Sequence, residues 1–264
     1  MKLGVSCDLR FHINEPTALM LMLRPLNGGS QKTIRSRYIV EPSVQIIESK
    51  DHYGNFCQRL IAPSGAFNIR ISAEVITADF IDRAPEAGFI DIQDLPHQVL
   101  PFLLPSRYCE SDLFGDLARE IVAYAPPGYY QVSEIVDWVR HFIQYTPGSS
   151  EYPLSAIETH NRGYGECRDL AQLAITLCRS ISIPARLAVG YLYQLEPMNL
   201  HTWFEAYIGG QWYAFDPTES ALRGGRVIIA VGRDAADVSI FHPFGTGCQL
   251  KRMDVRVNLL SKFV

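Results

Sequence analysis

The sequence has no excess of positive charge and no long apolar run, and each absence argues against a class of protein. Its 24 Lys and Arg against 28 Asp and Glu leave a formal net charge of −4. The sequence also has no run of basic residues. Neither observation points to nucleic acid or to an anionic membrane surface as a partner. No stretch of about 20 consecutive apolar residues is present, so no membrane-spanning helix is expected.

Paired cysteines of the CxxC type are also missing, which argues against a zinc ribbon or a thioredoxin-like site. Scattered single cysteines in a chain of 264 residues are typical of a reduced, intracellular protein rather than of a disulfide scaffold. The apolar run Leu3 to Cys7 is too short for a signal peptide, and Asp8 and Arg10 follow it. We therefore expect a cytoplasmic protein. The six cysteines are Cys7, Cys57, Cys109, Cys167, Cys178 and Cys248.

What is present is an ordinary globular composition, with 47% apolar and 20% charged residues, in a chain long enough for two domains. Residues 1–85 hold short apolar stretches without helical period, separated by turn residues such as Pro42 and Gly54. This spacing predicts an N-terminal β-sandwich domain. Prolines punctuate residues 86–110, which we interpret as a linker packed over the surface.

The remainder, residues 111–264, changes from helical to strand-like patterning. We expect helices that begin at Ser111 and Ser133 as N-caps, and a further helix that starts at Cys167. Antiparallel strands follow, and Val255 to Leu259 is expected to close their sheet. The predicted fold class is therefore α+β, a β-sandwich followed by a core of helices packed on an antiparallel sheet.

Cys167 stands directly after a loop punctuated by Gly163 and Gly165, at the start of the predicted helix. A helix N-terminus favours the thiolate, which is the reactive form of cysteine. The unpaired N–H groups of the first helical turn could donate to an oxyanion, and Gly165 would let the loop approach a substrate closely. The sequence predicts Cys167 as a thiolate nucleophile.

His201 and Asp216 fall on two predicted strands joined by Gly209-Gly210, a permitted two-residue hairpin turn. With that turn the numbers of paired residues sum to about 419, so Asp216 lies opposite Trp203 and diagonal to His201. Residues two apart on a strand share a face. The carboxylate can then reach the imidazole, and we predict His201 as the base and Asp216 as the residue that orients it.

These stretches resemble the transglutaminase-like superfamily of papain-related cysteine enzymes. The resemblance is carried by Gly165-Glu166-Cys167-Arg168-Asp169, by His201-Thr202-Trp203 and by Trp212 to Thr218, and bacterial members extend it to nearly the whole chain. It implies a papain-like, transglutaminase-like catalytic core at 111–264. It also implies that Cys167 attacks an amide carbonyl, and that the thioester then passes to water or to an amine.

The roles expected for several other residues near the predicted site are structural. Family members often carry His where Gln172 stands, and we interpret that position as structural. Asp169 and Arg168 are expected to serve the surface or the packing rather than catalysis, because an acidic residue suits a first helical turn. The second oxyanion donor is open between Tyr145, Tyr164 and Trp203.

The leading hypothesis is a thiol hydrolase, a cysteine protease or amidase that acts on a protein or peptide substrate. A cross-linking transglutaminase is the first alternative, although no calcium-binding loop spacing appears. A non-catalytic module that binds through the same cleft is the second. A metal site at Cys167 and His201 is disfavoured, because closely spaced further ligands are missing. No metal or cofactor is expected, and the sequence leaves the oligomeric state open.

Overall fold

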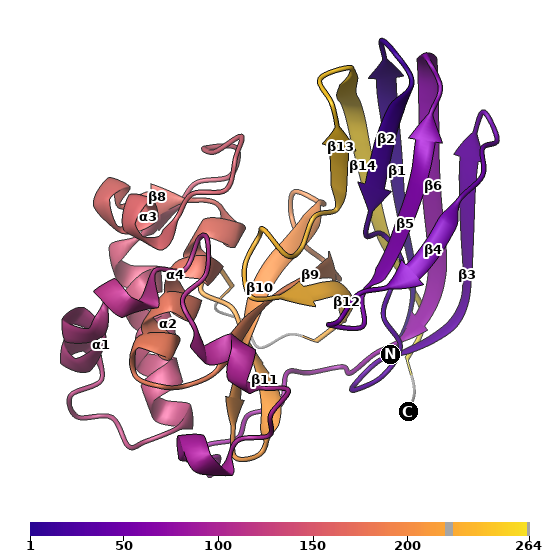
Figure 1. Ribbon diagram of the computed structural model, residues 1–264. Helices are drawn as coiled ribbons and strands as arrows, with labels where there is room; N and C mark the ends of the chain where they lie inside the picture. The colour runs from indigo at the N-terminus through magenta and orange to yellow at the C-terminus, as the bar shows by residue number, and fades with distance from the viewer. Residues whose placement is uncertain (220–223, 263–264) are drawn as a thin grey trace.

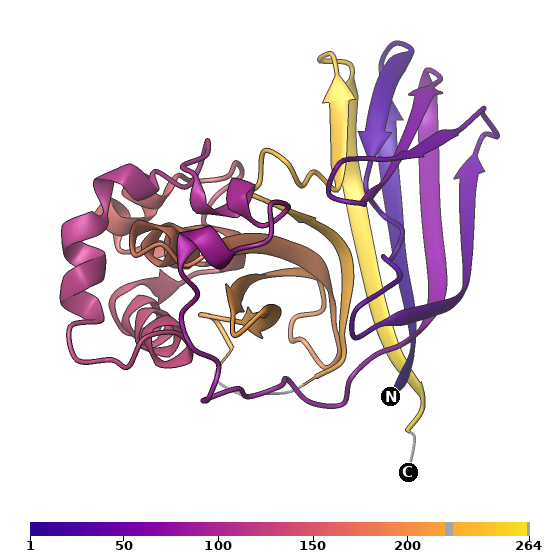
Figure 2. The ribbon, with the colours of Figure 1, turned by 60° about the horizontal axis from the view of Figure 1, so that its bottom comes forward.

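The protein is arranged in three parts that lie side by side. The structure, a computed structural model, describes residues 1–219 and 224–262. In Figure 1 a helical layer lies on the left, a curved sheet in the middle and a tall β-sandwich on the right. Figure 2, turned by 60°, shows the same order. The middle sheet is therefore in contact with both outer parts.

The sandwich consists of two four-stranded antiparallel sheets, which share one buried apolar cluster. Alternate residues of each long strand enter this cluster, as the period of two in the sequence predicts. The first sheet has the order β14 (Cys248–Ser261), β1 (Lys2–Ile13), β6 (Gly65–Ile76) and β3 (Lys32–Glu41). The second has the order β13 (Phe241–Phe244), β2 (Thr17–Leu21), β5 (Phe56–Ala62) and β4 (Ile47–Lys50). The predicted N-terminal β-sandwich is confirmed.

The strand predicted at Val255 to Leu259 exists, but its expected place in the core sheet is wrong. It is part of β14, which pairs with β1 and sets Val257 opposite Val5. Buried and exposed residues alternate from Val255 to Asn258, so the apolar pattern of this strand fits either sheet. Its length decides, because its 14 residues match the 12 of β1 and exceed every strand of the core sheet. The C-terminal strands therefore return to the N-terminal sandwich. Residues 85 and 110 as domain boundaries stay a prediction.

The middle sheet is antiparallel and has the order β11-β10-β9-β12, which leaves β11 and β12 at its edges. Its apolar residues reach both neighbours, because Phe204 packs with the helices while Tyr191 and Val227 join the buried cluster of the sandwich. The strands are β9 (Ala185–Leu192), β10 (Leu200–Ile208), β11 (Gln211–Phe215) and β12 (Arg226–Gly232). The expected α+β class, with helices packed on an antiparallel sheet, is confirmed.

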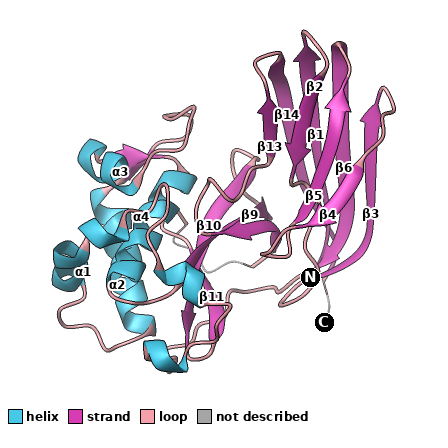
Figure 3. Ribbon diagram, viewed as in Figure 1, coloured by secondary structure: helices cyan, strands magenta, loops and turns pink. Residues whose placement is uncertain are grey.

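The helices all lie on the side of this sheet away from the sandwich (Figure 3). They are α1 (Gly115–Ile121), α2 (Tyr129–Phe142), α3 (Ala156–Arg162) and α4 (Cys167–Ser180). Three short 3-10 turns precede α1, at η1 (Ile92–Asp94), η2 (Leu100–Leu103) and η3 (Ser111–Leu113). A two-stranded parallel pair, β7 (Gln144–Tyr145) and β8 (Tyr164–Gly165), joins the loops before and after α3. None of the described helices is long and apolar enough to cross a membrane.

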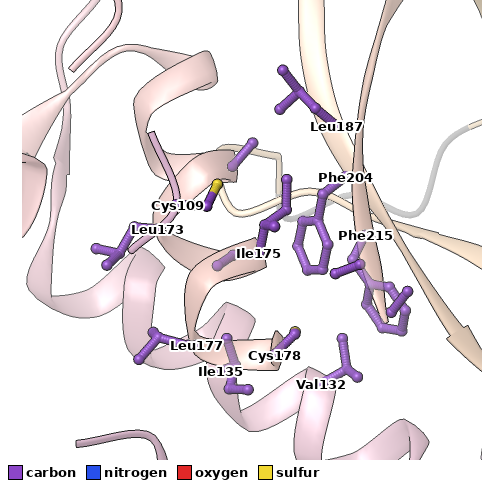
Figure 4. Packing of buried hydrophobic residues seen from close by; sticks show 14 of the residues in the cluster. Cys109, Val132, Ile135, Leu173, Ile175, Leu177, Cys178, Leu187, Phe204 and Phe215 are labelled. Carbon is purple, nitrogen blue, oxygen red and sulfur yellow. The ribbon is translucent and has the colours of Figure 1, made fainter. Parts of the chain in front are cut away.

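Helix α4 is the central helix of the core. Its apolar residues from Leu170 to Cys178 are completely buried, and the helix packs against β9 and β10 on one side and against the other helices elsewhere. In Figure 4, Leu173 and Leu177 lie on the side of α4 away from the strands, with Leu177 beside Ile135 of α2. Burial of each leucine side chain contributes roughly 1.5–3 kcal/mol. This anchoring determines where the first turn of α4, with Cys167, is held.

The two predicted serine N-caps are wrong. Ser111 lies in a 3-10 turn, and α1 begins only at Gly115. Helix α2 begins four residues before Ser133, after Gly128 with φ 100°, where the Gln131 side chain accepts the Gly128 N–H at 3.1 Å. A Cβ on Gly128 would lie 2.4 Å from a carbonyl oxygen of the linker. Close packing of the linker, which no local cap signal encodes, thus determines where α2 begins.

Candidate active site

Cys167 is the first residue of α4, and its side chain is partly exposed. The N–H groups of a first helical turn have no partners within the helix, so those at Cys167 are available to a ligand. The helix dipole also favours a negative charge at this end. The predicted position of the thiol, at the start of a helix with a buried face, is confirmed.

His201 lies beside this thiol as the second residue of β10, and it is 2% exposed. Its Nε2 is 2.7 Å from Oδ2 of Asp216. Nδ1 is therefore the ring nitrogen left to face the Cys167 thiol, which is one of the groups that raise the pKa of the imidazole. Trp203 stacks against the ring, with 6.2 Å between the centroids. The imidazole thus bridges the carboxylate and the sulfur.

The groups around His201 hold a proton on the imidazole. Burial by itself lowers the pKa of His201, but hydrogen bonds to Asp216 and Cys167, together with their negative charges, raise it to about 9. Burial raises the pKa of Asp216, and there His201, Arg226 and Thr218 outweigh burial and hold the pKa well below its usual range. At neutral pH the arrangement favours an imidazolium next to the sulfur.

The predicted hairpin register is confirmed. Ile208 pairs with Gln211 and Phe204 with Phe215, so each pair sums to 419. Gly209 and Gly210 both have positive φ, 56° and 90°, which a tight two-residue hairpin turn requires. Asp216 follows the last paired residue of β11, and its side chain reaches His201 diagonally across the two strands.

Arg226 is a neighbour of the site that the sequence analysis missed. Its Nη2 donates to Oδ2 of Asp216 at 2.9 Å, and both side chains are buried. Thr218 donates to Oδ1 from its backbone N–H at 3.0 Å and from Oγ1 at 2.8 Å. Arg140 on α2 donates to the backbone carbonyl of Asp216 at 3.0 Å. Only the Thr218 contact could have been expected, because an Asx turn is a local pattern.

Asp169 is fully buried, so a surface role is wrong for it. Its Oδ2 accepts from Ser150 Oγ at 2.6 Å and from the Glu166 N–H at 3.1 Å, and Oδ1 accepts from the Leu154 N–H at 3.1 Å. The carboxylate therefore ties the residue before Cys167 to the loop that precedes α3. Arg168 donates to the same carboxylate at 3.2 Å and remains partly exposed.

Two further expectations concern packing near Cys167. Gly165 is buried, and a Cβ there would lie 2.9 Å from Cβ of Asp169. The glycine therefore permits close packing against Asp169, and its expected part in substrate approach stays a prediction. Gln172 is fully buried, donates to the Leu154 carbonyl at 2.8 Å and accepts from the Ala235 N–H at 3.0 Å. The structural role predicted for Gln172 agrees with these contacts.

A pocket of about 210 Å³ opens over the thiol and is lined by Cys167 and His201. One wall comes from the loop between β9 and β10, through residues such as Glu196 and Pro197, and the other comes from Tyr145 on β7. A larger cavity of about 520 Å³, between the sandwich and the middle sheet, does not include the thiol or the imidazole. A substrate would thus reach the sulfur through the smaller pocket.

The three candidate oxyanion donors differ in position. Trp203 is fully buried, and its indole nitrogen is out of reach of a substrate. Tyr164 is exposed but lies outside the residues that line the pocket. Tyr145 lines it, and burial, followed by the negative charges of Cys167 and nearby carboxylates, raises the pKa of its phenol to about 12. Tyr145 therefore keeps a proton that it can donate beside the thiol.

Metal binding finds no support at this site. In the part of the chain that the structure describes, no three or more His, Cys, Asp or Glu side chains are grouped so that they could hold a metal ion. The six cysteines are all free, and four of them are buried. The chemistry available here is that of the Cys167 sulfur, the imidazole and the carboxylate.

Comparison with known proteins agrees with the fold. The family model of the transglutaminase-like superfamily matches residues 115–217, a range that contains all three predicted site residues. The crystal structure of a protein from Cytophaga hutchinsonii, described as a "putative cysteine protease", is similar with a TM-score of 0.92 and 36% identity. That similarity covers 100% of this chain and 92% of the other.

An uncharacterized protein of Mycobacterium leprae is also similar, 29% identical over 250 residues that cover 90% of this chain and 89% of the relative. Together with the nearly complete match to the Cytophaga hutchinsonii structure, these similarities show the family. The chain belongs to the transglutaminase-like superfamily.

Proposed function

We propose that the protein is a cysteine-dependent acyl-transfer enzyme that cleaves peptide or side-chain amide bonds, with Cys167, His201 and Asp216 as its triad. The observation that supports this most strongly is the imidazole of His201, held between the Asp216 carboxylate and the Cys167 sulfur at the base of an open pocket. The proposed substrate is a protein or a peptide.

In the proposed first half of the reaction, the Cys167 sulfur attacks the carbonyl carbon of the bound amide. A C–S bond forms, and the carbonyl oxygen becomes an oxyanion. The C–N bond then breaks, and the departing amine takes the proton that His201 carries. The acyl group remains on Cys167 as a thioester, while Asp216 keeps the imidazole in the required tautomer.

The oxyanion would need two donors in the pocket. The backbone N–H of Cys167 lies at the start of α4, where the dipole also favours negative charge. The Tyr145 phenol lines the same pocket and keeps its proton, so we assign it as the second donor. Loss of one such donor in other enzymes costs about 10²- to 10³-fold in rate.

In the second half, water attacks the thioester carbonyl and gives one proton to the neutral His201. A C–O bond forms and the C–S bond breaks, which releases a carboxylic acid and restores the thiolate beside the imidazolium. Hydrolysis is the outcome that we favour over transfer to an amine. The Cys167 side chain is partly exposed, so water reaches the thioester. The 36% identical neighbour is itself described as a "putative cysteine protease", which supports the same choice.

The first test is alkylation of Cys167 by iodoacetamide across pH, with the labelled site located by mass spectrometry. The imidazolium beside the sulfur should keep labelling fast well below pH 7, and His201→Ala should move the profile to higher pH. A profile with the ordinary thiol midpoint near 8.5 would contradict the proposal and favour a binding module.

Turnover of casein and of fluorogenic peptide amides is the second test. Cys167→Ala should lower it by roughly 10³- to 10⁶-fold. The matched control is Cys178→Ala on the buried face of the same helix, which should keep turnover and lose about 1 kcal/mol of stability. Equal turnover in wild type and Cys167→Ala would exclude the thiol as nucleophile.

A further inference from the structure

The sandwich is hydrogen-bonded along the outer edge of β12, the edge strand of the middle sheet. The Gln31 side chain donates to the Ile228 carbonyl at 2.9 Å and accepts the Ile228 N–H at 2.7 Å. Asn55 does the same for Val231, at 2.8 and 2.9 Å. Each amide thus pairs with one residue of β12 as a neighbouring strand would. The sandwich therefore helps to determine where β12 lies.

The hydrogen bonds from the sandwich to β12 form a seam between the two parts. Arg226, the first residue of β12, lies between this seam and the proposed active site. Its carbonyl accepts from Oγ1 of Thr77 at 2.7 Å, and Thr77 directly follows β6 of the sandwich. Its guanidinium donates to Oδ2 of Asp216 at 2.9 Å and lies over the Trp203 ring, 5.5 Å from the centroid. A continuous series of contacts thus runs from the sandwich to His201.

We propose that Arg226 is a positioning residue, which the sandwich holds against Asp216 so that the carboxylate keeps the His201 imidazole in place. This inference rests on the proposed function. It gives the sandwich a part in the reaction through Thr77, which binds the carbonyl of Arg226 itself.

The geometry shows why the carboxylate needs this support. Oδ2 of Asp216 is shared by Nε2 of His201 and Nη2 of Arg226, while Thr218 donates twice to Oδ1. Donors on both oxygens define the plane of the carboxylate, and this plane directs the imidazole towards Cys167. Without Arg226, the imidazole would be the one partner left on Oδ2 among the described residues, and the carboxylate could rotate with it.

Arg226 also acts through its charge. Asp216 is buried, and a buried carboxylate stays ionised only when opposite charges and hydrogen bonds outweigh the loss of solvent. Loss of the guanidinium raises the pKa of Asp216, and a protonated Asp216 no longer stabilises the imidazolium. The activated thiol would then be lost at a higher pH as the solution is acidified. Among the residues that the structure describes, the titratable and charged groups that face Asp216 are His201, Arg226, Arg140 and Tyr145, and Cys167 lies beyond the imidazole.

The test measures alkylation of Cys167 by iodoacetamide from pH 4 to 9 in the full-length protein, which requires no substrate. In Arg226→Met we expect labelling at pH 6 to be about 10-fold slower than in wild type. The acid limb of the profile, the pH range in which labelling falls as the solution is acidified, should lie at least about one pH unit higher. Arg226→Lys keeps the positive charge and should return the acid limb most of the way to its wild-type position. An unchanged acid limb in Arg226→Met would overturn the proposal.

The matched control is Asn55→Ala, which removes a contact of the same seam five residues along β12. It should lower the melting temperature and leave the alkylation profile unchanged, because it does not touch Asp216. If Asn55→Ala and Arg226→Met shift the acid limb equally, Arg226 only stabilises the seam and the proposal is wrong.

A double-mutant comparison keeps the test decisive if Arg226→Met alone does not fold. In Asp216→Asn no carboxylate is left for Arg226 to hold, so adding Arg226→Met should slow alkylation no further. A further 10-fold loss would show that Arg226 acts by another route. A wild-type profile like that of an ordinary thiol would instead refute the proposed function, whereas an activated wild type with an unaffected Arg226→Met refutes this inference alone.

Discussion

The two sides of the proposed triad are supported in opposite ways. On the cysteine side, Asp169 binds groups from Ser150 to Glu166, all within 19 residues of itself. On the aspartate side, the carboxylate is held by Arg226, whose strand is in turn held by residues of the sandwich more than 140 positions away. The Cys167 sulfur is thus supported by local structure, whereas the contacts of the Asp216 carboxylate link the imidazole to the distant sandwich.

Asp216→Asn should have the largest effect, and it acts on the long-range side. An amide cannot stabilise the imidazolium and allows the wrong tautomer, so turnover should fall roughly 10²- to 10⁴-fold. It also leaves the buried Arg226 without its carboxylate, which should cost roughly 3 kcal/mol. Turnover and urea unfolding measure the two effects.

The control for this prediction adds Arg226→Met to Asp216→Asn, which removes the guanidinium that has lost the Asp216 carboxylate. The double variant should recover most of the lost stability and none of the turnover. If turnover returns with stability, the role of Asp216 is structural, and the difference between the two sides of the triad disappears.

The pH dependence of stability tests the contact between His201 and Asp216 without a change to Asp216. The pKa of His201 is raised to about 9, so the stability that its protonation contributes is complete below about pH 6.5 and lost as the pH rises through about 9. It amounts to at most roughly 3 kcal/mol. Urea unfolding at pH 6 and pH 9.5 should show wild type converging with His201→Gln at the higher pH. The exposed residue His12, changed to Gln, should leave the difference between the two pH values unaltered.

The sequence predicted the local parts of this site because each depends on a short pattern. The glycine pair at 209 and 210 determined the register that brings Asp216 to His201, and the apolar stripe after Cys167 placed the thiol at a helix start. The α+β class and the sandwich followed from the change of period along the chain.

The long-range parts could not be predicted in the same way. Nothing in the pattern around Arg226 says which buried carboxylate it meets, because that depends on how the sandwich packs against β12. The same limit misplaced Val255 to Leu259, whose alternation fits two sheets equally well. Packing of the linker likewise moved the start of α2 away from Ser133.

On the local side, Asp169→Asn should have a smaller effect than the loss of Asp216. One oxygen becomes an NH₂ group that faces N–H or O–H donors, so a buried donor loses its acceptor at a cost of about 1–3 kcal/mol. Because Glu166 is no longer held, alkylation of Cys167 at pH 6 should slow several-fold without a change in its acid limb. A shifted acid limb would mean that the two sides are coupled.

The smallest expected effect compares two glycines of one loop. A Cβ on Gly165 would lie 2.9 Å from Cβ of Asp169, so Gly165→Ala should cost about 1–3 kcal/mol and slow alkylation of Cys167 by displacing Asp169. Gly163 ends α3 with φ 72° and has open space around it. Gly163→Ala should cost about 1 kcal/mol through backbone strain alone and leave alkylation unchanged. Equal alkylation rates in the two variants would show that the Asp169 contact does not support the thiol.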